Sequence, residues 1–366
     1  MTQVYDIAII GGGIMGCAAA LRVREGGMVP IVLDQGDLGQ GASGVNAGTL
    51  SLQIKRVKLM PYALKGHHEW ERMGDAVGFQ KTGGYTLAFT EREAALLHER
   101  QARKASAGAP ITFVSPHRVH KAEPKLAQKV LAASYCPEDG YANSSLTGQY
   151  FRGRLRDQNI AFRERCPVTA IDRAGDGCTL ATSSGPIHAR RLLLAAGAWL
   201  KPVAALLGVD LPVQARINTV SVTERMPPLV STMIGHATGL LTMKQKPNGT
   251  VLVGGGWQGR GTPQGGRGQV TAASVQPNLA LAQYALPGLA RARVLRSWTG
   301  FEANVPDFYP LAGALPGVGN AFVLGCVRGG YTIGPYIGRL MGDFILGREP
   351  ELPLFDPARN FDQETT

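Results

Sequence analysis

The chain has 366 residues, of which 44% are hydrophobic and 18% charged, so it is long enough to bury a sizeable core and predicts two domains. Its formal net charge is +11, but the basic residues are scattered, without dense Lys/Arg tracts or interleaved aromatic residues, which argues against nucleic-acid binding. Five cysteines without a CxxC pair indicate neither a disulfide framework nor a zinc site, and no apolar run is long enough for a spanning helix.

The beginning of the chain predicts a strand, a helix and a second strand, the repeating unit of a parallel sheet. Val4–Ile10 is a short β-branched apolar run that ends in glycines, Ile14–Glu25 is rich in alanine, and residues 30–34 form the second strand. Because the first strand begins at once and no basic and apolar leader precedes it, we expect no signal peptide and a cytoplasmic location.

A glycine-rich turn joins the first strand to the helix. Gly11, Gly13 and Gly16 fit the G-x-G-x-x-G pattern, and Asp34 ends the next strand. In this context Gly11 permits a tight turn, Gly13 lets backbone N–H groups approach a pyrophosphate, and Gly16 lets the helix pack closely on the strand. The helix N-terminus favours the anion, and Asp34 would accept hydrogen bonds from a ribose with a free 2′-hydroxyl. The pattern predicts a dinucleotide site; the alternative is a glycine-rich turn in some other α/β fold.

Beyond this unit the predicted elements mix helix and strand. A Gly/Ala/Ser loop is expected at 36–48, helices at 61–73, 91–105 and 331–346, strands at 83–90, 130–135, 160–165, 168–171, 178–183, 189–196 and 321–324, and several alternating strands over 217–253. A glycine-rich connector at 254–268 is expected at the surface or at a domain edge.

A second strand that ends in glycine, within residues 190–199, lies far downstream of the first glycine turn. Together the two segments resemble the two-part signature of FAD enzymes in the D-amino acid oxidase and glycine/sarcosine oxidase superfamily. The resemblance continues along nearly the whole chain, through residues 40–48, 83–89, 139–144, 301–313 and 323–335. Among its branches the chain most resembles the FAD-carrying β subunits of opine oxidase, hydrogen cyanide synthase and proline or D-hydroxyproline dehydrogenases.

This resemblance implies an α/β fold, α+β overall, in which a Rossmann-like FAD-binding domain of glutathione-reductase type is interleaved with an antiparallel-sheet substrate domain. The implied FAD-binding domain comprises residues 1–84, 140–215 and 319–366, and the substrate-binding domain comprises residues 85–139 and 216–318. Non-covalent FAD is the implied cofactor. The residues implied to hold it are Gly11, Gly13, Ile14, Met15, Gly16, Asp34, Gln35, Ala42, Ser43, Asn46, Ala47, Gly48, Thr49, Val168, Ala196, Gly197, Trp199, Arg328, Gly329, Gly330, Tyr331 and Thr332.

The resemblance also implies the chemistry, in which a hydride passes from the carbon bearing the substrate amine to flavin N5 and water hydrolyses the imine. The helix that follows Gly329 is implied to stabilise negative charge at flavin N1 and C2=O. Arg328 is the candidate anchor for a substrate carboxylate, because its guanidinium fork matches that group; the alternative is a surface arginine in a turn. Tyr331, Tyr85 and Trp257 are candidate pocket walls, although core packing explains each of them equally well.

One segment departs from the family pattern. Amino-acid-oxidising relatives commonly carry Gly-x-Arg-Pro, whose arginine helps to bind the substrate carboxylate, whereas this chain has Gly300, Phe301, Glu302 and Ala303. A desolvated carboxylate at Glu302 would repel a simple carboxylate strongly. We therefore expect Glu302 to meet a cationic or amine group, as in a larger secondary amine of the opine type, rather than a small D-amino acid.

Flavin attachment is expected to be non-covalent. Sarcosine oxidase relatives carry a cysteine where this chain has Gly300, and dimethylglycine dehydrogenase relatives carry a histidine in the first loop where this chain has Val45 and Asn46. None of the seven histidines falls in a flavin motif, and His67 and His68 are expected to be packed or solvated on a helix rather than to bind a metal.

Two further classes of protein stay open. The missing arginine-proline pair also fits an FAD-bearing assembly or electron-transfer subunit with a degenerate amine site, and an NAD-linked dehydrogenase would lack the yellow colour of a flavoprotein. The expected partners are a small amine or amino acid substrate and further subunits of a hetero-oligomeric dehydrogenase, with no nucleic acid and no transmembrane segment.

Overall fold

The computed structural model describes residues 3–175, 177–325 and 328–361, and these fall into two compact units. Unit 1 comprises Met1–Val45, Ser144–Arg216 and Phe301–Thr366, and unit 2 comprises Asn46–Asn143 and Ile217–Gly300. Cys326 and Val327, which belong to the family-like segment 323–335, lie outside the described residues. Each unit has its own large sheet.

Unit 1 contains strands and helices that alternate along part of the chain. The strands that lie wholly in this unit are β1 (Val4–Ile10), β2 (Pro30–Leu33), β9 (Ala161–Arg163), β10 (Val168–Ala174), β11 (Gly177–Thr182), β12 (Ile187–Leu194), β18 (Leu311–Ala314) and β19 (Ala321–Gly325). Its helices are α1 (Ile14–Glu25), α2 (Ala42–Val45), α6 (Ser144–Asp157), a 3-10 turn at Gly197–Trp199, α7 (Leu200–Ala205) and α9 (Gly330–Ile345). Their order is that of a doubly wound α/β sheet with antiparallel additions.

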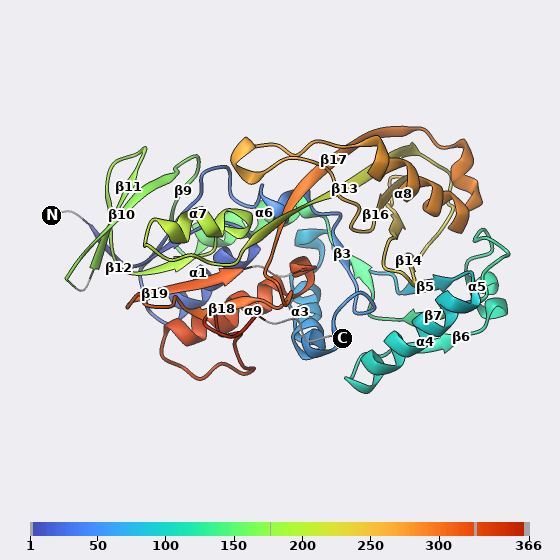
Figure 1. The fold of residues 1–366 in the computed structure, drawn as a ribbon, viewed down its shortest axis with the longest axis horizontal. Helices are drawn as coiled ribbons and strands as arrows, with labels where there is room; N and C mark the ends of the chain where they lie inside the picture. The colour runs from blue at the N-terminus through green and yellow to red at the C-terminus, as the bar shows by residue number, and fades with distance from the viewer. Residues whose placement is uncertain (1–2, 176, 326–327, 362–366) are drawn as a thin grey trace. The chain divides into compact units, whose positions relative to one another are not determined.

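The centre of this sheet is parallel. Its order is β10-β11-β12-β1-β2-β9, and β19 also pairs with β12 and β18. Figure 1 labels β9, β10, β11, β12, β18 and β19 of this sheet. Ile10 at the end of β1 pairs with Leu33 of β2 and Leu194 of β12, so these three strands end at the same edge. β19 runs parallel to β12, while β10, β11 and β18 are antiparallel. In open α/β sheets ligands bind beyond the carboxyl ends of the parallel strands, so this edge is where a cofactor is expected.

Helices α1 and α9 pack against each other through glycines of α9. A Cβ added to Gly338 would lie 2.6 Å from the Met15 carbonyl oxygen, and one added to Gly342 would lie 2.6 Å from Arg22 Cβ. At the start of α9, a Cβ on Gly334 would lie 3.2 Å from Ile14 Cγ2, at the start of α1. The N-termini of the two helices therefore lie close together, and both follow parallel strands of the sheet.

Unit 2 contains a large sheet, a small sheet and several helices. The strands are β3 (Thr49–Leu50), β4 (Gln80–Lys81), β5 (Gly84–Ala88), β6 (Thr112–Val114), β7 (Ala132–Cys136), β8 (Gly140–Tyr141), β13 (Gln214–Arg225), β14 (Met233–His236), β15 (Thr242–Gln245), β16 (Thr250–Gly254) and β17 (Val294–Asn304), the ends of β13 and β17 reaching into unit 1. The helices are α3 (Met60–Met73), α4 (Glu91–Ser106), α5 (Pro116–Ala122) and α8 (Ala272–Ala285), with 3-10 turns at Val57–Leu59, Gly74–Val77, Pro263–Gly265 and Pro287–Arg291.

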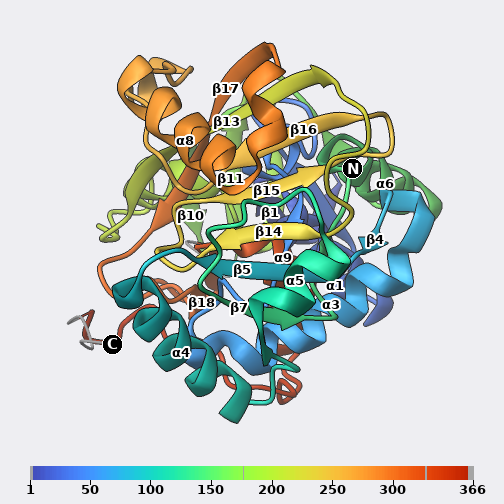
Figure 2. The same cartoon turned by 90° about the vertical axis from the view of Figure 1, so that its right-hand side faces the viewer.

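The large sheet of unit 2 runs β17-β13-β16-β15-β14-β5-β7-β6, and Figure 2 shows the middle of this order face on. Its registered pairs are antiparallel except that β14 and β5 run parallel, with Ile234 opposite Tyr85. The small sheet has the order β3-β8-β4. The expected antiparallel substrate sheet is therefore a mixed sheet with one parallel pair at its centre.

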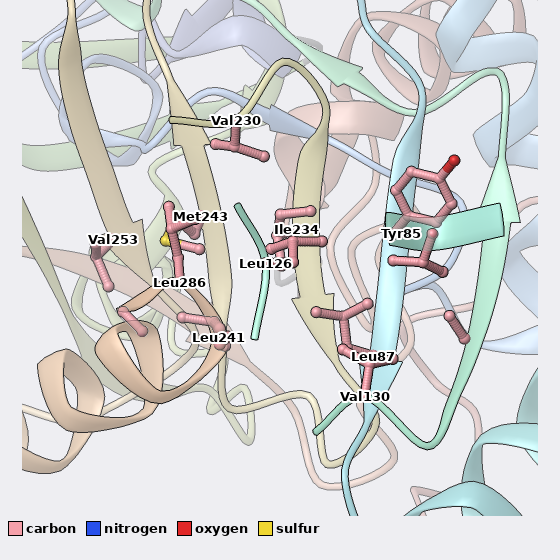
Figure 3. Close-up of a cluster of buried hydrophobic side chains, with 14 of the residues drawn as sticks. Tyr85, Leu87, Leu126, Val130, Val230, Ile234, Leu241, Met243, Val253 and Leu286 are labelled. Carbon is pink, nitrogen blue, oxygen red and sulfur yellow. The ribbon is translucent and has the colours of Figure 1, made fainter. Parts of the chain in front are cut away.

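Buried side chains on one face of the large sheet form the hydrophobic core of unit 2 (Figure 3). Leu87 of β5, Ile234 of β14 and Met243 of β15 are fully or almost fully inaccessible to solvent, and Leu286 after α8 packs against them. This core accounts for the alternation of apolar and polar residues over 217–253, because one face of each strand is buried.

The division into units differs in four places from the domain boundaries expected from the sequence. Residues 46–84 and 140–143 belong to unit 2, and residues 216 and 301–318 belong to unit 1. Residues 301–318 include β18, which pairs antiparallel with β19 and so extends the sheet of unit 1. Residues 46–84 and 140–143 are joined in the small sheet, because Thr49 of β3 and Gln80 of β4 both pair with Tyr141 of β8. None of the described helices is both long and apolar enough to cross a membrane.

Candidate functional site

The glycine turn lies at the carboxyl edge of the unit 1 sheet. Gly11 has φ +116°, and a Cβ added to it would lie 2.3 Å from the Ala195 carbonyl oxygen. A Cβ on Gly16 would lie 2.0 Å from the Gly11 carbonyl oxygen, so this glycine allows α1 to approach the turn closely. Gly13 is the N-cap residue of α1 and has no side chain over the helix N-terminus. These three glycines remove side chains that would keep an anion away from the turn and from the start of α1.

Asp34 follows β2 directly and holds the turn in place. Its Oδ2 accepts a hydrogen bond from the Gly12 N–H at 2.7 Å, and its Oδ1 accepts one from the Gly36 N–H at 2.8 Å. Burial raises the pKa of the Asp34 carboxyl, while these two backbone bonds act in the opposite direction. The neighbouring Gln35 is exposed. Each carboxylate oxygen can accept a second hydrogen bond, so Asp34 can also bind a ribose hydroxyl.

The loop at 40–48 returns to the start of α1. Its first part forms the short helix α2, in which Ser43 Oγ accepts a hydrogen bond from the Ile14 N–H at 3.1 Å. Ala42 stands at the start of α2. The first N–H groups of a helix have no partner inside it, so the rest of the first turn of α1, including Met15, is available to an anion.

The second part of this loop belongs to unit 2. Asn46 Oδ1 accepts a hydrogen bond from the Gly48 N–H at 2.7 Å, which closes a tight turn around Ala47. Gly48 has φ +73°, and a Cβ on it would lie 2.0 Å from the Ala142 carbonyl oxygen. Thr49 then enters β3. Only glycine fits at position 48, because the backbone of the 139–144 segment occupies the space of a side chain.

The segment after β12 carries three more of the predicted cofactor residues. Ala196 caps a 3-10 turn that starts at Gly197, where φ is +55°, and ends at Trp199. The Trp199 ring meets the Phe301 ring edge-on, with 5.7 Å between centroids. Val168 lies at the start of β10, on the antiparallel extension of the sheet. The turn after β12 stands beside the glycine turn, because Ala195 lies against Gly11.

Glu302, the acidic residue that departs from the family pattern, binds the start of α9. Gly329, with φ +66°, is the N-cap residue, and its N–H donates a hydrogen bond to Glu302 Oε1 at 2.7 Å. Gly330 begins the helix and Thr332 is fully buried. A carboxylate at this place is stabilised by the positive end of the helix dipole. Sequence reasoning placed Glu302 near a substrate amine and did not foresee this contact.

Tyr331 and Arg328, the two candidate substrate-binding residues at the start of α9, have different surroundings. Tyr331 is buried, and its hydroxyl shares a hydrogen bond of 2.7 Å with Thr147 Oγ1 of α6, while burial raises its pKa. Arg328 is exposed, and its guanidinium lies 5.8 Å from the centroid of the Phe308 ring. Arg328 is thus exposed beside Phe308, and Tyr331 has a buried contact within unit 1.

The remaining pocket candidates belong to unit 2. Tyr85 of β5 packs in the hydrophobic core (Figure 3). Its ring also packs against Tyr135, with 4.8 Å between ring centroids. The Trp257 indole N–H donates to the Leu240 carbonyl oxygen at 2.8 Å. His67 is buried and His68 is exposed on α3, in agreement with the packed or solvated pair expected from the sequence. No cluster of His, Cys, Asp and Glu side chains suited to a metal ion occurs among the described residues.

Sequence reasoning missed a buried lysine in unit 2. Lys244 of β15 is 1% exposed, and its Nζ donates a hydrogen bond to Thr49 Oγ1 at 2.5 Å. Burial lowers its pKa, and the neighbouring Lys246 lowers it further. A charged residue at an inward position of an alternating strand was the available signal, but its partner lies 195 residues away.

Comparison with known proteins agrees with this geometry. The family described as FAD dependent oxidoreductase (DAO) matches residues 6–344. A glycine oxidase from Geobacillus kaustophilus (strain HTA426) is 28% identical, over 97% of this chain and 96% of that protein. One of the subunits of an opine oxidase from Rhizobium meliloti is 26% identical, over 98% of both chains.

Solved structures show the same fold. The crystal structure of glycine oxidase from Geobacillus kaustophilus superposes with a TM-score of 0.90 at 25% identity, covering 98% of this chain and all of that one. An L-proline dehydrogenase from P. horikoshii gives a TM-score of 0.89 at 20% identity, over 98% of each chain. The glycine turn, the acidic residue after β2 and the mixed second sheet therefore occur in an architecture shared along the whole chain.

Proposed function

Because the chain belongs to the DAO family of FAD dependent oxidoreductases, we propose that it oxidises the C–N bond of a secondary amine or D-amino-acid-like substrate, of the opine or imino acid type. It is an FAD-dependent enzyme of the amine and amino acid oxidase and dehydrogenase class. The observation that carries the proposal is the cradle formed by Gly11, the start of α1 and Asp34, which fits the diphosphate and ribose of FAD. When bound, FAD supplies a hydride acceptor at N5.

The chain's own residues have separate tasks in this proposal. The glycine turn and the start of α1 hold the diphosphate, and Asp34 orients the ribose. The N–H groups at the start of α9 stabilise negative charge on the flavin ring. Arg328 anchors a substrate carboxylate through its guanidinium fork. Non-covalent attachment is inferred from Gly300 and from Val45 and Asn46, at positions where covalently linked relatives differ.

The proposal predicts that the purified yellow protein is bleached under anaerobic conditions by one class within a panel of opines, N-methyl amino acids and D-amino acids. The measurement is the loss of flavin absorbance during stopped-flow mixing, and acid precipitation should leave the yellow colour in the supernatant. A protein that binds FAD and is reduced by dithionite, but by none of these amines, would instead be an electron-transfer or assembly subunit. The likeness to one of the subunits of an opine oxidase supports further subunits as partners in either case.

Glu302 is proposed to favour substrates that carry a cationic or amine arm. Its carboxylate stands at the start of α9, bound to Gly329, where it adds negative charge near the proposed flavin ring. The Glu302→Gln variant is expected to lose about tenfold of the preference in kcat/KM for cationic over neutral substrates, since one charge interaction of about 1.4 kcal/mol disappears. Steady-state assays with paired substrates measure this ratio, and an unchanged ratio would remove Glu302 from substrate selection.

A further inference from the structure

One edge of the large sheet in unit 2 has no strand beside it. β17 is the first strand in the order β17-β13-β16-β15-β14-β5-β7-β6, and among the described residues it pairs with β13 alone. Figure 2 shows β17 at the end of this sheet, beyond β13. The part of β17 that belongs to unit 2 comprises residues 294–300. An unpaired edge presents a row of backbone N–H and C=O groups, so it can bind another extended segment.

The contacts at the start of β17 are made with β13. Ser297 Oγ lies 2.7 Å from Ser221 Oγ, and the Arg293 carbonyl oxygen accepts a hydrogen bond from the Glu224 N–H at 2.9 Å. The Glu224 carboxylate in turn accepts one from the Arg293 N–H at 3.1 Å. Within the described part of the chain no loop or turn forms a backbone hydrogen bond with residues 294–297. The outer edge of this segment is therefore open.

Two large apolar side chains are exposed at the start of β17. Leu295 is 65% exposed and Val294 is 42% exposed. Side chains alternate between the two faces of a strand, so these neighbours lie on opposite faces and both faces are open here. A single exposed apolar residue is ordinary, but two beside an unpaired edge add apolar surface to the backbone groups that can pair with another strand.

Three exposed arginines flank these apolar side chains. Arg291 ends the 3-10 turn before β17, Arg293 directly precedes the strand, and Arg296 lies within it. Residues 286–300 contain no acidic residue. The three guanidinium groups form no ion pair with other described residues. This end of the sheet edge is therefore electropositive and attracts carboxylates.

The charge decides which kind of chain fits this edge. A second copy of this chain would bring the same three arginines close to one another, and like charges that face each other across paired strands are destabilising. The formal net charge of +11 adds repulsion at longer range. An acidic extended segment brings carboxylates to the arginines and also pairs with the backbone edge. Lipid headgroups would meet the arginines but leave the row of backbone N–H and C=O groups without strand partners.

We propose that the outer edge of residues 293–297 is a docking site for an acidic, extended segment of another protein, which joins the large sheet as a further strand. Arg293 and Leu295 share one face of this edge, because they are two residues apart. Val294 and Arg296 share the other face for the same reason. The segment that fits best therefore carries an acidic and an apolar residue on each of its own faces, as a Glu-Glu-Val-Val repeat does. The inference concerns unit 2 alone and does not depend on the proposed reaction.

The test titrates the FAD-loaded protein into a fluorescein-labelled peptide of two Glu-Glu-Val-Val repeats at low salt and follows fluorescence anisotropy. This peptide should bind saturably, and a peptide with lysine in place of each glutamate should not. Methylation of alternate backbone nitrogens keeps the charge of the acidic peptide and removes N–H donors from its pairing edge. The methylated peptide should bind at least about tenfold more weakly.

Variants of the protein test whether the peptide binds at this edge. The double variant Arg293→Gln with Arg296→Gln removes two positive charges and should raise the Kd of the acidic peptide at least about tenfold. Leu295→Ser removes exposed apolar surface and should raise the Kd about threefold or more. Arg103→Gln is the matched control, because it removes an exposed arginine from α4, which packs against β5 and β7, and it should change the Kd less than about twofold. The flavin absorbance of each variant shows that it is folded and loaded.

Several results would overturn the inference. Absent binding of the acidic peptide, equal binding of its methylated form, or an unchanged Kd in the double arginine variant would show that this edge is not the docking site. Tighter binding to vesicles of phosphatidylglycerol and phosphatidylcholine than to the peptide, lost in the double arginine variant, would identify a membrane surface instead. Dimers of the unmodified protein in sedimentation velocity that dissociate in Leu295→Ser would identify a second copy of this chain as the occupant.

Discussion

Replacing Gly11 with alanine is expected to weaken FAD binding at least about 100-fold, which corresponds to about 2.7 kcal/mol. The new Cβ would lie 2.3 Å from the Ala195 carbonyl oxygen, and that atom is backbone, so it cannot turn aside. The φ of +116° is strained for any residue with a side chain and alone costs about 1 to 3 kcal/mol. The turn cannot shift freely, because the Gly11 N–H donates to the Leu33 carbonyl oxygen at 2.7 Å.

Titration of the apoprotein with FAD, followed by quenching of flavin fluorescence, measures this loss. Gly41→Ala is the matched control, since Gly41 is exposed in the next loop and an added Cβ there meets no atom within 4 Å. Circular dichroism at the assay temperature should show that both variants are folded. If Gly11→Ala bound FAD within threefold of the unmodified protein, the turn would not be the cradle of the diphosphate.

The first strand, the glycine turn and α1 could be predicted because the sequence signals for them lie close together in the chain. The glycine turn, α1 and Asp34 lie within a single stretch of about thirty residues, and the spacing alone defines the geometry. β1 and α1 begin and end at the predicted residues, Val4–Ile10 and Ile14–Glu25. Family assignment follows from the same turn together with the second glycine-ended strand, which became β12.

The elements that sequence reasoning missed depend on distant contacts. β17 contains Arg296, Gly300 and Glu302, so its residues do not alternate cleanly, and its strand form depends on its place beside β13. α8 has Pro277 in its interior and apolar residues on all sides, so no amphipathic pattern reveals it. Both lie in stretches where tertiary packing outweighs local propensity.

In the candidate site, too, contacts between residues near each other in the chain could be predicted and contacts between distant segments could not. Asp34 was predicted from its place after the second strand, and it contacts the glycine turn. Ser43 was predicted from the family resemblance of residues 40–48, and it contacts the start of α1. The bond of Glu302 to Gly329 joins two segments 27 residues apart, and that of Lys244 to Thr49 joins two strands in different sheets. A single sequence contains no spacing rule for such contacts, because they follow from how strands and helices assemble.

His67 is expected to make the protein markedly less stable in acid. It is 3% exposed on α3, and neither ring nitrogen has a hydrogen-bond partner among the described residues. Burial, with a smaller contribution from the charges of Lys55, Lys81 and His68, lowers its pKa from 6.5 to about 3. Between these values the unfolded chain binds a proton that the folded protein does not, so the free energy of unfolding falls as the pH decreases from 6.5 to 3.

The full loss over that window is on the order of 4 to 5 kcal/mol, since each pKa unit corresponds to about 1.36 kcal/mol. Carboxylates also titrate there, so the measured quantity is the difference between the unmodified protein and His67→Leu, which fills the same apolar site without a proton-binding group. Urea unfolding with saturating FAD should show this variant gaining stability relative to the unmodified protein as the pH falls from 7 to 4.5. His68→Leu is the control, because His68 is the next residue and is exposed. The free energy of unfolding of this variant should change with pH in parallel with that of the unmodified protein. Parallel curves for His67→Leu as well would mean that His67 is not held neutral by burial.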